Sequence, residues 1–228
     1  MDYIIESVEK PSNELIQYFR EIPTAIVSDS LGRNNTMKSN VKPIYSGVHL
    51  CGPALTVKIS ANDNLILHKA IKMAEPGDIL VVDTGGYSES AVWGELMSIS
   101  AKSNGISGIV IDGAVRDIRK IIELRFPVFC TSIVPRAPYS VHSGSINVAI
   151  LCGGTIVSPG DTVIGDDDGV VVVPREKVEE VLVKCKTKIE EEEEIRLRVT
   201  NGEFMYDILG FKRYFDCLEV SQVKNDRE

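Results

Sequence analysis

The sequence predicts an α/β protein: a layered α/β/β domain with a βαβαβ core, a β-rich second layer and a C-terminal helical extension. Three nearly continuous apolar runs, at 79–83, 108–112 and 128–133, alternate with two segments of helical pattern. Such runs are typical of parallel strands that are buried on both faces. The region 145–174 differs, because Gly-Gly, Pro-Gly-Asp and Asp-Asp-Gly turns divide its short apolar runs. This pattern favours an antiparallel or mixed β layer.

The residues before this core are predicted to form three helices and one strand. Ser12 is a helix-capping residue, and Ile16 and Phe19 lie on one face of the helix that follows it. The segment 54–60 alternates apolar and polar residues, which is the period of a half-exposed strand. In chain order we expect helices at 13–19 and 24–31, a loop at 33–46, a strand at 54–60 and a helix at 64–74.

Two helices are expected inside the core, at 95–104 and 115–124. Gly105 ends the first of them. Right-handed crossovers place the loops after the first two core strands at the same carboxyl edge of the sheet. The apolar face of the second helix is made of Val115, Ile118, Ile121 and Ile122.

The C-terminal part begins with a long charged helix at 176–198, followed by an apolar and aromatic tail at 202–220. The tail side chains need a surface to cover them, and both a neighbouring subunit and packing within the chain remain open. They are Phe204, Tyr206, Ile208, Leu209 and Phe211. We therefore expect an α/β/β catalytic domain at 1–175, which includes the N-terminal helices. Residues 176–228 form a C-terminal helix and tail that packs on the core or on a neighbouring subunit.

Composition narrows the class of protein. The 228 residues suffice for one large domain with a full core, and 43% hydrophobic with 25% charged content is typical of soluble globular proteins. No run approaches the roughly 20 apolar residues that span a bilayer, and no signal peptide is evident. The net charge of −8 argues against a nucleic-acid partner. Five scattered cysteines without a C-x-x-C pattern indicate reduced core residues in a cytoplasmic protein: Cys51, Cys130, Cys152, Cys185 and Cys217.

The stretch 85–117 carries the predicted site. Twenty residues separate Glu95 from Arg116, enough for one helix and one strand, so both can lie at one end of the sheet. A helix that begins near residue 94 presents free N–H groups to a carboxylate. The planar fork of Arg116 suits a carboxylate or keto oxygen, and one carboxylate with water ligands, Asp117, suits Mg²⁺. The candidate residues are Gly94, Glu95, Leu96, Met97, Arg116 and Asp117.

Each of these residues also has a purely structural explanation. Gly94 allows tight packing of the helix after Trp93. Arg116 can form an ion pair with Asp117 or with Asp112, and Asp117 can cap the helix that follows it. Taken together at one sheet edge, however, they favour an anionic substrate held beside a divalent metal ion.

Other motifs are better explained without a site. Residues 81–86 are similar to the start of a methyltransferase or dinucleotide site, but the further spaced glycines are missing. Residues 166–169 are explained by a hairpin turn rather than by Ca²⁺ binding, and residues 190–194 by a solvated helix face. The three histidines, His49, His68 and His142, show no ligand spacing and are assigned no role.

At the site motif the chain resembles a known family, the RraA-like proteins. These include the class II, metal-dependent 4-hydroxy-4-methyl-2-oxoglutarate aldolases, which also decarboxylate oxaloacetate. The strongest resemblance is a motif in which an acidic residue is followed, after twenty intervening residues, by the pair Arg-Asp. The acidic residue is Glu95 in this chain, whereas the aldolases have aspartate there. The resemblance covers most of the chain through TAIVSDSLG at 24–32, GPA at 52–54, PGD at 76–78 and 159–161, and DGV at 168–170.

The resemblance implies roles for the motif. The backbone of Gly94, Glu95, Leu96 and Met97 binds a pyruvate-like carboxylate. Arg116 binds the substrate carboxylate or keto oxygen, and Asp117 holds Mg²⁺ or Mn²⁺, largely through water. It also implies homotrimers or hexamers with sites between subunits.

We therefore predict a divalent-metal-dependent lyase that cleaves 4-hydroxy-2-oxo diacids to pyruvate and decarboxylates oxaloacetate. A metal ion and Arg116 stabilise the enolate; Glu95 or an acid from a neighbouring subunit polarises the water that protonates it. None of the six candidate site residues is a lysine, which disfavours a Schiff-base aldolase. The partner is thus a small 2-oxo acid, with no nucleic acid or membrane involved. Two alternatives remain: a non-catalytic protein that binds and regulates a ribonuclease, and the same chemistry on another 2-oxo acid.

Overall fold

The computed structural model describes residues 2–218 and 220. It divides into two compact units, one ending at Cys185 and one beginning at Lys186. The expected domain boundary at 175/176 stays a prediction. Residues 1, 219 and 221–228, which belong to the two expected domains, lie outside the described part of the chain. Among the helices that the structure describes, none is both long and apolar enough to cross a lipid bilayer.

The element order confirms the predicted α/β class. The helices are α1 (Asn13–Phe19), α2 (Thr24–Ser30), α3 (Leu65–Met73), α4 (Glu95–Ser103), α5 (Ile118–Leu124), the 3₁₀ turn η1 (Arg175–Lys177), α6 (Val178–Thr200), α7 (Met205–Ile208) and α8 (Lys212–Phe215). The strands are β1 (Lys42–Pro43), β2 (Leu50–Ile59), β3 (Ile79–Asp83), β4 (Ala91–Trp93), β5 (Gly108–Val115), β6 (Val128–Ile133), β7 (Gly144–Ile146), β8 (Ile150–Cys152), β9 (Thr155–Val157), β10 (Thr162–Asp166) and β11 (Gly169–Val173).

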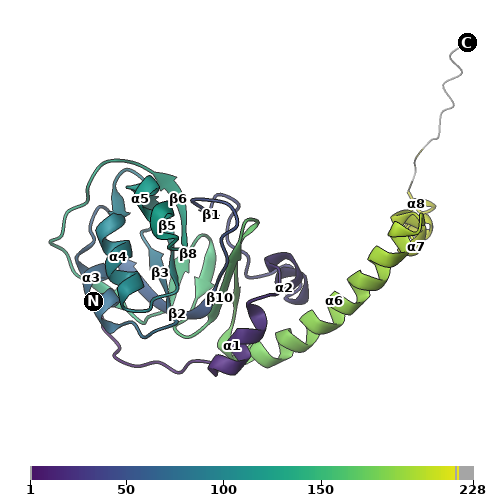
Figure 1. Cartoon of the computed structure of the whole chain (residues 1–228), viewed down its shortest axis with the longest axis horizontal. Helices are drawn as coiled ribbons and strands as arrows, with labels where there is room; N and C mark the ends of the chain where they lie inside the picture. Colours follow the sequence, from purple (N-terminus) through teal and green to yellow (C-terminus); the bar gives the residue numbers. More distant parts are fainter. Residues whose placement is uncertain (1, 219, 221–228) are drawn as a thin grey trace, which may run out of the picture. The chain divides into compact units, whose positions relative to one another are not determined.

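The predicted βαβαβ core is formed by β3, α4, β5, α5 and β6. β2, β3, β5 and β6 are parallel neighbours, and the main sheet has the order β1-β6-β5-β3-β2-β10-β11. Helices α3, α4 and α5 lie together on one side of these strands (Figure 1). Alternation along β3 explains why both faces are apolar: Leu80 and Val82 pack under these helices, whereas Ile79 and Val81 pack against the second β layer.

The second layer is built from β8, β9, β10 and β11. Its far face is covered by α1, α2 and the first turns of α6, through a third apolar cluster that includes Phe19, Val27 and Cys185. β2 joins the layers, because its first half pairs with β10 and its second half with β3. The predicted hairpin at 166–169 is confirmed, with Asp166 opposite Gly169.

Several boundaries differ from the predictions. β2 is buried along its length except at Lys58, so the expected half-exposed strand was wrong; it has apolar clusters on both faces. The expected loop at 33–46 contains β1, which pairs with β6. The second core strand runs on to Val115, so α5 begins only at Ile118. Ile122, expected to face inward, is 37% exposed.

The cysteines follow the prediction with one exception. Cys51, Cys130, Cys152 and Cys185 are buried and free. Burial raises the pKa of the Cys51 thiol to about 12 and that of Cys130 to about 11, which leaves both unreactive near neutral pH. Cys217 is exposed and therefore is not a core residue.

Candidate functional site

The site forms where two neighbouring strands end. β4, which was not expected from the sequence, pairs with the last residues of β5, placing Trp93 beside Val115. The Arg116 backbone N–H donates to the Trp93 carbonyl at 3.0 Å, so Gly94 and Arg116 leave the sheet side by side. This pairing brings the two ends of the predicted motif together.

The start of α4 is fixed by a short hydrogen-bond chain. Trp93 Nε1–H donates to Ser98 Oγ at 2.7 Å, and Ser98 Oγ–H donates to the Gly94 carbonyl at 3.0 Å. The Trp93 ring is fully buried and stacks on Phe126, with centroids 6.2 Å apart. The first turn of α4 is therefore held rigidly against the sheet, and its early N–H groups keep a fixed direction.

Gly94 matters because of what lies beside it. A Cβ atom at this position would lie 2.6 Å from Asp117 Oδ2 and 3.3 Å from Arg116 Cγ. Its φ of −161° is ordinary extended backbone, so glycine is required here by close approach and not by conformation. The absent side chain leaves room for the Arg-Asp pair against the helix start.

Asp117 is turned toward α4 rather than toward its own helix. Its backbone has φ +60°, in the left-handed region, and its side chain makes no capping bond to α5. Oδ2 instead accepts from the Glu95 N–H at 3.2 Å and lies 3.6 Å from Arg116 Nε. Asp117 stands at the position just before α5, but the side-chain cap considered as its structural explanation is not formed. Of the two ion pairs considered for Arg116, the one with Asp117 is formed. Both side chains remain about 40% exposed (40% and 42%), which leaves them accessible to a ligand.

A cavity of about 360 Å³ opens over this corner, and all six predicted residues line it. Gly94, Glu95, Leu96 and Met97 form the wall at the start of α4, with Arg116 and Asp117 next to them. The opposite wall comes from α3 and its N-terminal side, and includes Asn64 and His68. His68 was assigned no role from the sequence. The one sequence signal that could have placed it at the cavity is helical spacing, since His68 on α3 lies one turn after Asn64, the residue just before that helix.

A connecting segment, residues 134–143, which we call the strap, contributes one residue to the cavity. Pro138 lines the cavity, and the Asn64 side chain accepts from Ser140 Oγ–H at 2.6 Å. Asp63 anchors the end of the strap by accepting from the N–H groups of Val141 and His142 at 2.8 and 3.0 Å. The strap is therefore tied to the start of α3.

The donor set at Asp117 fits a hard, water-rich cation. Within the described residues, no group of three or more His, Cys, Asp or Glu side chains is arranged to hold a metal ion. Asp117 would then supply one ligand, and water and substrate oxygens would fill the rest of the coordination shell of the ion. This arrangement suits Mg²⁺, because Mg²⁺ retains much of its hydration. A site closed by protein ligands, as structural Zn²⁺ requires, does not match these residues.

A second cavity lies at the ends of the parallel strands on the other face of the sheet. It has a volume of about 850 Å³ and shares no lining residue with the first. Asp83 and Asp112 line it. Asp112 Oδ1 accepts from the Thr84 N–H and hydroxyl, at 2.7 and 2.9 Å, and so belongs to this cavity rather than to Arg116.

Comparison with known proteins gives a family match over most of the fold. The family model described as RraA-like, aldolase/RraA, matches residues 24–172. A protein of Halalkalibacterium halodurans, named provisionally as a 4-hydroxy-4-methyl-2-oxoglutarate aldolase, is 41% identical over 192 residues, covering 84% of this chain and 91% of that protein. An uncharacterized protein of Methanocaldococcus jannaschii is 44% identical over 177 residues, covering 76% of this chain and 85% of that protein.

A solved structure extends the comparison to three dimensions. Streptomyces coelicolor RraAS2, described as an unusual member of the RNase ES inhibitor RraA protein family, aligns with a TM-score of 0.73 and 29% identity. The alignment covers 83% of this chain and all of that one. The same scaffold thus occurs in proteins named for a lyase activity and in one named for ribonuclease inhibition.

Proposed function

The chain belongs to the RraA-like family, and from this premise we propose that it is a divalent-metal-dependent carbon–carbon lyase. Its substrates are 4-hydroxy-2-oxo diacids of the 4-hydroxy-4-methyl-2-oxoglutarate type, and it also decarboxylates oxaloacetate. One observation carries the proposal: the first turn of α4, Arg116 and Asp117 line a single cavity. A protein that acted only as a binding surface would not need this combination of anion-binding and cation-binding groups.

The first turn of α4 binds the carboxylate next to the 2-oxo group. Free N–H groups at a helix N-terminus carry partial positive charge and point at an anion that lies just beyond the helix end. The Glu95 N–H already donates to Asp117 Oδ2. The backbone N–H groups of Leu96 and Met97 are the ones left to receive the substrate.

Arg116 handles the charge that develops during cleavage. When the bond between C3 and C4 breaks, its electron pair passes toward the 2-oxo oxygen. In the aldol cleavage the 4-hydroxyl gives its proton to water and the other fragment leaves as a carbonyl compound, and in the decarboxylation the other fragment leaves as CO₂. The guanidinium donates hydrogen bonds to this oxygen and stabilises the enolate. A divalent cation held by Asp117 supplies further Lewis-acid polarisation when it is bound. Glu95, half-buried at the cavity wall, directs a proton to C3 through water.

His68 faces the same cavity from α3 and gives the second carboxylate of a diacid a hydrogen-bond donor. From this placement we expect a preference for diacids over pyruvate-like monoacids. A His68→Leu variant, which removes the hydrogen-bond donor, is therefore expected to slow both diacid reactions more than the exchange of pyruvate methyl protons, which needs only the 2-oxo acid end. Equal slowing of all three reactions would contradict the assignment.

The test is pyruvate release from oxaloacetate and from 4-hydroxy-4-methyl-2-oxoglutarate, with Mg²⁺ and then with EDTA. We expect release that EDTA abolishes, and a loss on the order of 10²–10³ in Arg116→Ala, because one charge-stabilising contact is removed. Asp117→Ala is expected to lose activity with the metal. Arg119→Ala is the matched control, since this neighbouring arginine is exposed and lies outside the cavity lining. Release no faster than with metal alone, or normal turnover in Arg116→Ala, would refute the proposal.

The ribonuclease-regulator function is the second candidate, favoured by the similarity to RraAS2. It predicts no metal-dependent turnover and instead inhibition of an RNase ES-type ribonuclease by the purified chain. Inhibition that survives Arg116→Ala, together with absent lyase activity, would establish this alternative.

A further inference from the structure

A row of polar side chains crosses four parallel strands at their carboxyl ends. Lys58 on β2 is the register partner of Asp83 on β3. One residue earlier, Val82 pairs with Ile111, and Ile111 pairs with Cys130. Asp112 therefore lies between Asp83 and Thr131, so the row reads Lys58, Asp83, Asp112, Thr131.

The row points away from the helices of the core. Val57, Val82, Ile111 and Cys130, each one residue earlier, all belong to the apolar cluster under α3, α4 and α5. Because side chains alternate along a strand, the next residue on each strand faces the other side. All four polar residues line the second cavity, of about 850 Å³. Crevices at the carboxyl ends of parallel strands are where α/β sheets commonly bind ligands.

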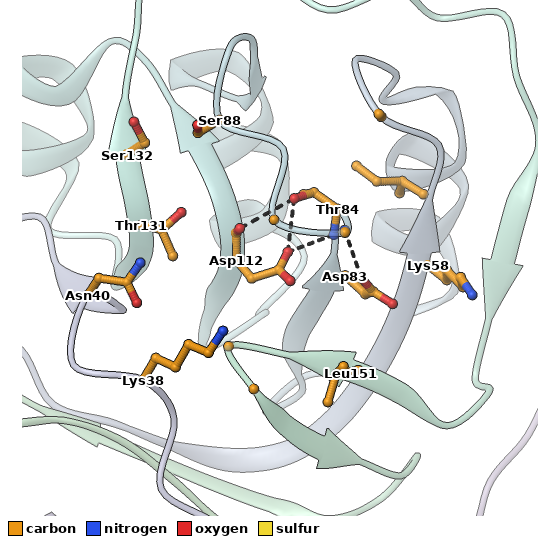
Figure 2. A pocket seen from close by; sticks show the side chains of 16 residues that line it. Lys38, Asn40, Lys58, Asp83, Thr84, Ser88, Asp112, Thr131, Ser132 and Leu151 are labelled. Carbon is orange, nitrogen blue, oxygen red and sulfur yellow. Dashed lines mark hydrogen bonds between the residues drawn. The ribbon is translucent and has the colours of Figure 1, made fainter.

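The opposite wall of this cavity comes from distant parts of the chain. The turn between β8 and β9 contributes Gly153 and Gly154, and the segment before β1 contributes Lys38 and Asn40. Figure 2 shows the Lys38 side chain extended across the cavity with its ammonium group toward Asp112, and Asn40 beside Thr131. Acidic groups thus face basic and amide groups across an open space.

The two carboxylates are buried, and Asp83 is only partly satisfied. Asp83 and Asp112 are each 8% exposed. Asp83 Oδ1 accepts from the Gly85 N–H at 2.8 Å, and no hydrogen bond from the described residues reaches its Oδ2. Asp112 Oδ1 is held by Thr84. Burial raises the pKa of Asp112, hydrogen bonds from Thr84 and from the Gly153 backbone oppose that shift, and the nearby charge of Asp83 adds to it.

The lysines do not neutralise these carboxylates. In the part of the chain that the structure describes, no ion pair within 4.0 Å joins Lys38 or Lys58 to Asp83 or Asp112. Two like charges side by side favour a cationic group between them. The unpaired ammonium of Lys38 across the cavity favours an anionic group at the other end of the same ligand.

We propose that this cavity binds a small zwitterion, an amino acid, with its ammonium group between Asp83 and Asp112 and its carboxylate at Lys38 and Asn40. A bare divalent cation fits less well, since no third acidic or histidine ligand joins the two aspartates among the described residues. A neutral polyol fits less well because it leaves both charges of the aspartate pair uncompensated. The site is independent of the Arg116 cavity.

The test is binding of the standard L-amino acids to the full chain, first by thermal shift and then by calorimetry. At least one amino acid is expected to bind. Its analogue with hydroxyl in place of ammonium, and the amine without the carboxylate, are expected to bind about tenfold more weakly or worse, as loss of one hydrogen bond to a charged group predicts. Equal binding of the amine alone, or binding of Mn²⁺ but of no amino acid, would overturn the proposal.

Variants separate this site from the first one. Asp112→Asn and Lys38→Met are each expected to weaken binding about tenfold or more, and Lys38 is exposed, so its replacement leaves the core intact. Arg116→Ala is the control and is expected to bind the amino acid as the unaltered chain does. Because the assay measures binding and not turnover, it is unaffected if the proposed lyase function fails. Unchanged affinity in both Asp112→Asn and Lys38→Met would refute the site.

Discussion

At Gly94 the backbone of α4 passes so close to the Arg-Asp pair that one methyl group decides its geometry. The built Cβ position lies 2.6 Å from Asp117 Oδ2, a distance that side chains do not tolerate. Asp117 is half-exposed and can move, whereas the helix start is held by the buried Trp93–Ser98 bond. Added volume at Gly94 is therefore expected to displace Asp117 and not the helix.

The Gly94→Ala variant is predicted to keep the fold but to lose most of its lyase activity. Since φ at Gly94 is ordinary for alanine, the unfolding free energy should change by about 1 kcal/mol or less. Pyruvate release should fall by about tenfold or more, because a small misplacement of catalytic groups is costly. The control is Ser103→Ala, an exposed position on the same helix. Full activity in Gly94→Ala would show that the close contact with Asp117 is unimportant.

On the scale of the elements, the strap is the least regular part of the cavity and depends on one buried carboxylate. Asp63 is 2% exposed and accepts four hydrogen bonds, from the Leu65, Val141 and His142 N–H groups and from His142 Nδ1. Burial alone would raise its pKa, but the hydrogen bonds prevail and hold the pKa below 3.8. The ionised form is thus the one that ties the strap to α3.

Asp63→Asn is predicted to destabilise the fold in a pH-dependent way. At neutral pH the loss should be about 1–3 kcal/mol, because an amide cannot accept the same set of N–H groups. A carboxylate whose folded pKa is lowered contributes its stability above the unfolded value, and that contribution disappears as pH falls through the folded pKa. The unfolding free energies of the variant and the unaltered chain should therefore converge below pH 3.8.

The control for this experiment is His142→Ala, which removes one side-chain contact but keeps the backbone N–H bond to Asp63. The His142 side chain is 62% exposed, so the expected loss is about 0.5 kcal/mol. Urea unfolding at several pH values measures both variants. A constant difference between Asp63→Asn and the unaltered chain from neutral to acid pH would contradict the linkage.

For the whole molecule, the C-terminal unit is notable for the large apolar side chains that it exposes. Its aromatic residues contact one another edge to face, with Tyr206 6.4 Å from Phe211 and 6.2 Å from Phe215, yet remain exposed. The exposed residues include Phe204, Met205, Tyr206, Phe211, Tyr214, Phe215 and Leu218. Exposed patches of this kind mark contacts between proteins.

We predict that the chain forms closed homo-oligomers through this unit, as trimers or hexamers. Sedimentation equilibrium should give three or six times the chain mass of 25.1 kDa. Replacing Phe211 and Phe215 together with serine should lower the apparent mass, whereas Lys184→Ala, an exposed residue of α6, should not. A mass of 25.1 kDa for the unaltered chain at micromolar concentration would contradict the prediction.

The sequence by itself determined the features that depend on neighbouring residues. Apolar runs and helical periodicity located β3, α4, β5, α5 and β6, and the Asp168-Gly169 turn located the β10–β11 hairpin. The Arg116–Asp117 motif was recognisable because strand and helix lengths bring both ends of a βαβ unit to one edge. These are local patterns, because the spacing of apolar residues along each strand or helix depends on that segment alone.

Only the tertiary structure decided features that depend on segments far apart in the chain. β4 is three residues long and exists because β5 lies beside it. β2 alternates like a half-exposed strand, but layers from other parts of the chain cover both of its faces. His68 and the Lys58–Asp83–Asp112–Thr131 row become cavity residues through packing and strand register. The sequence gives the chemical type of each side chain. Contacts between residues far apart in the chain decide which of these side chains face one another.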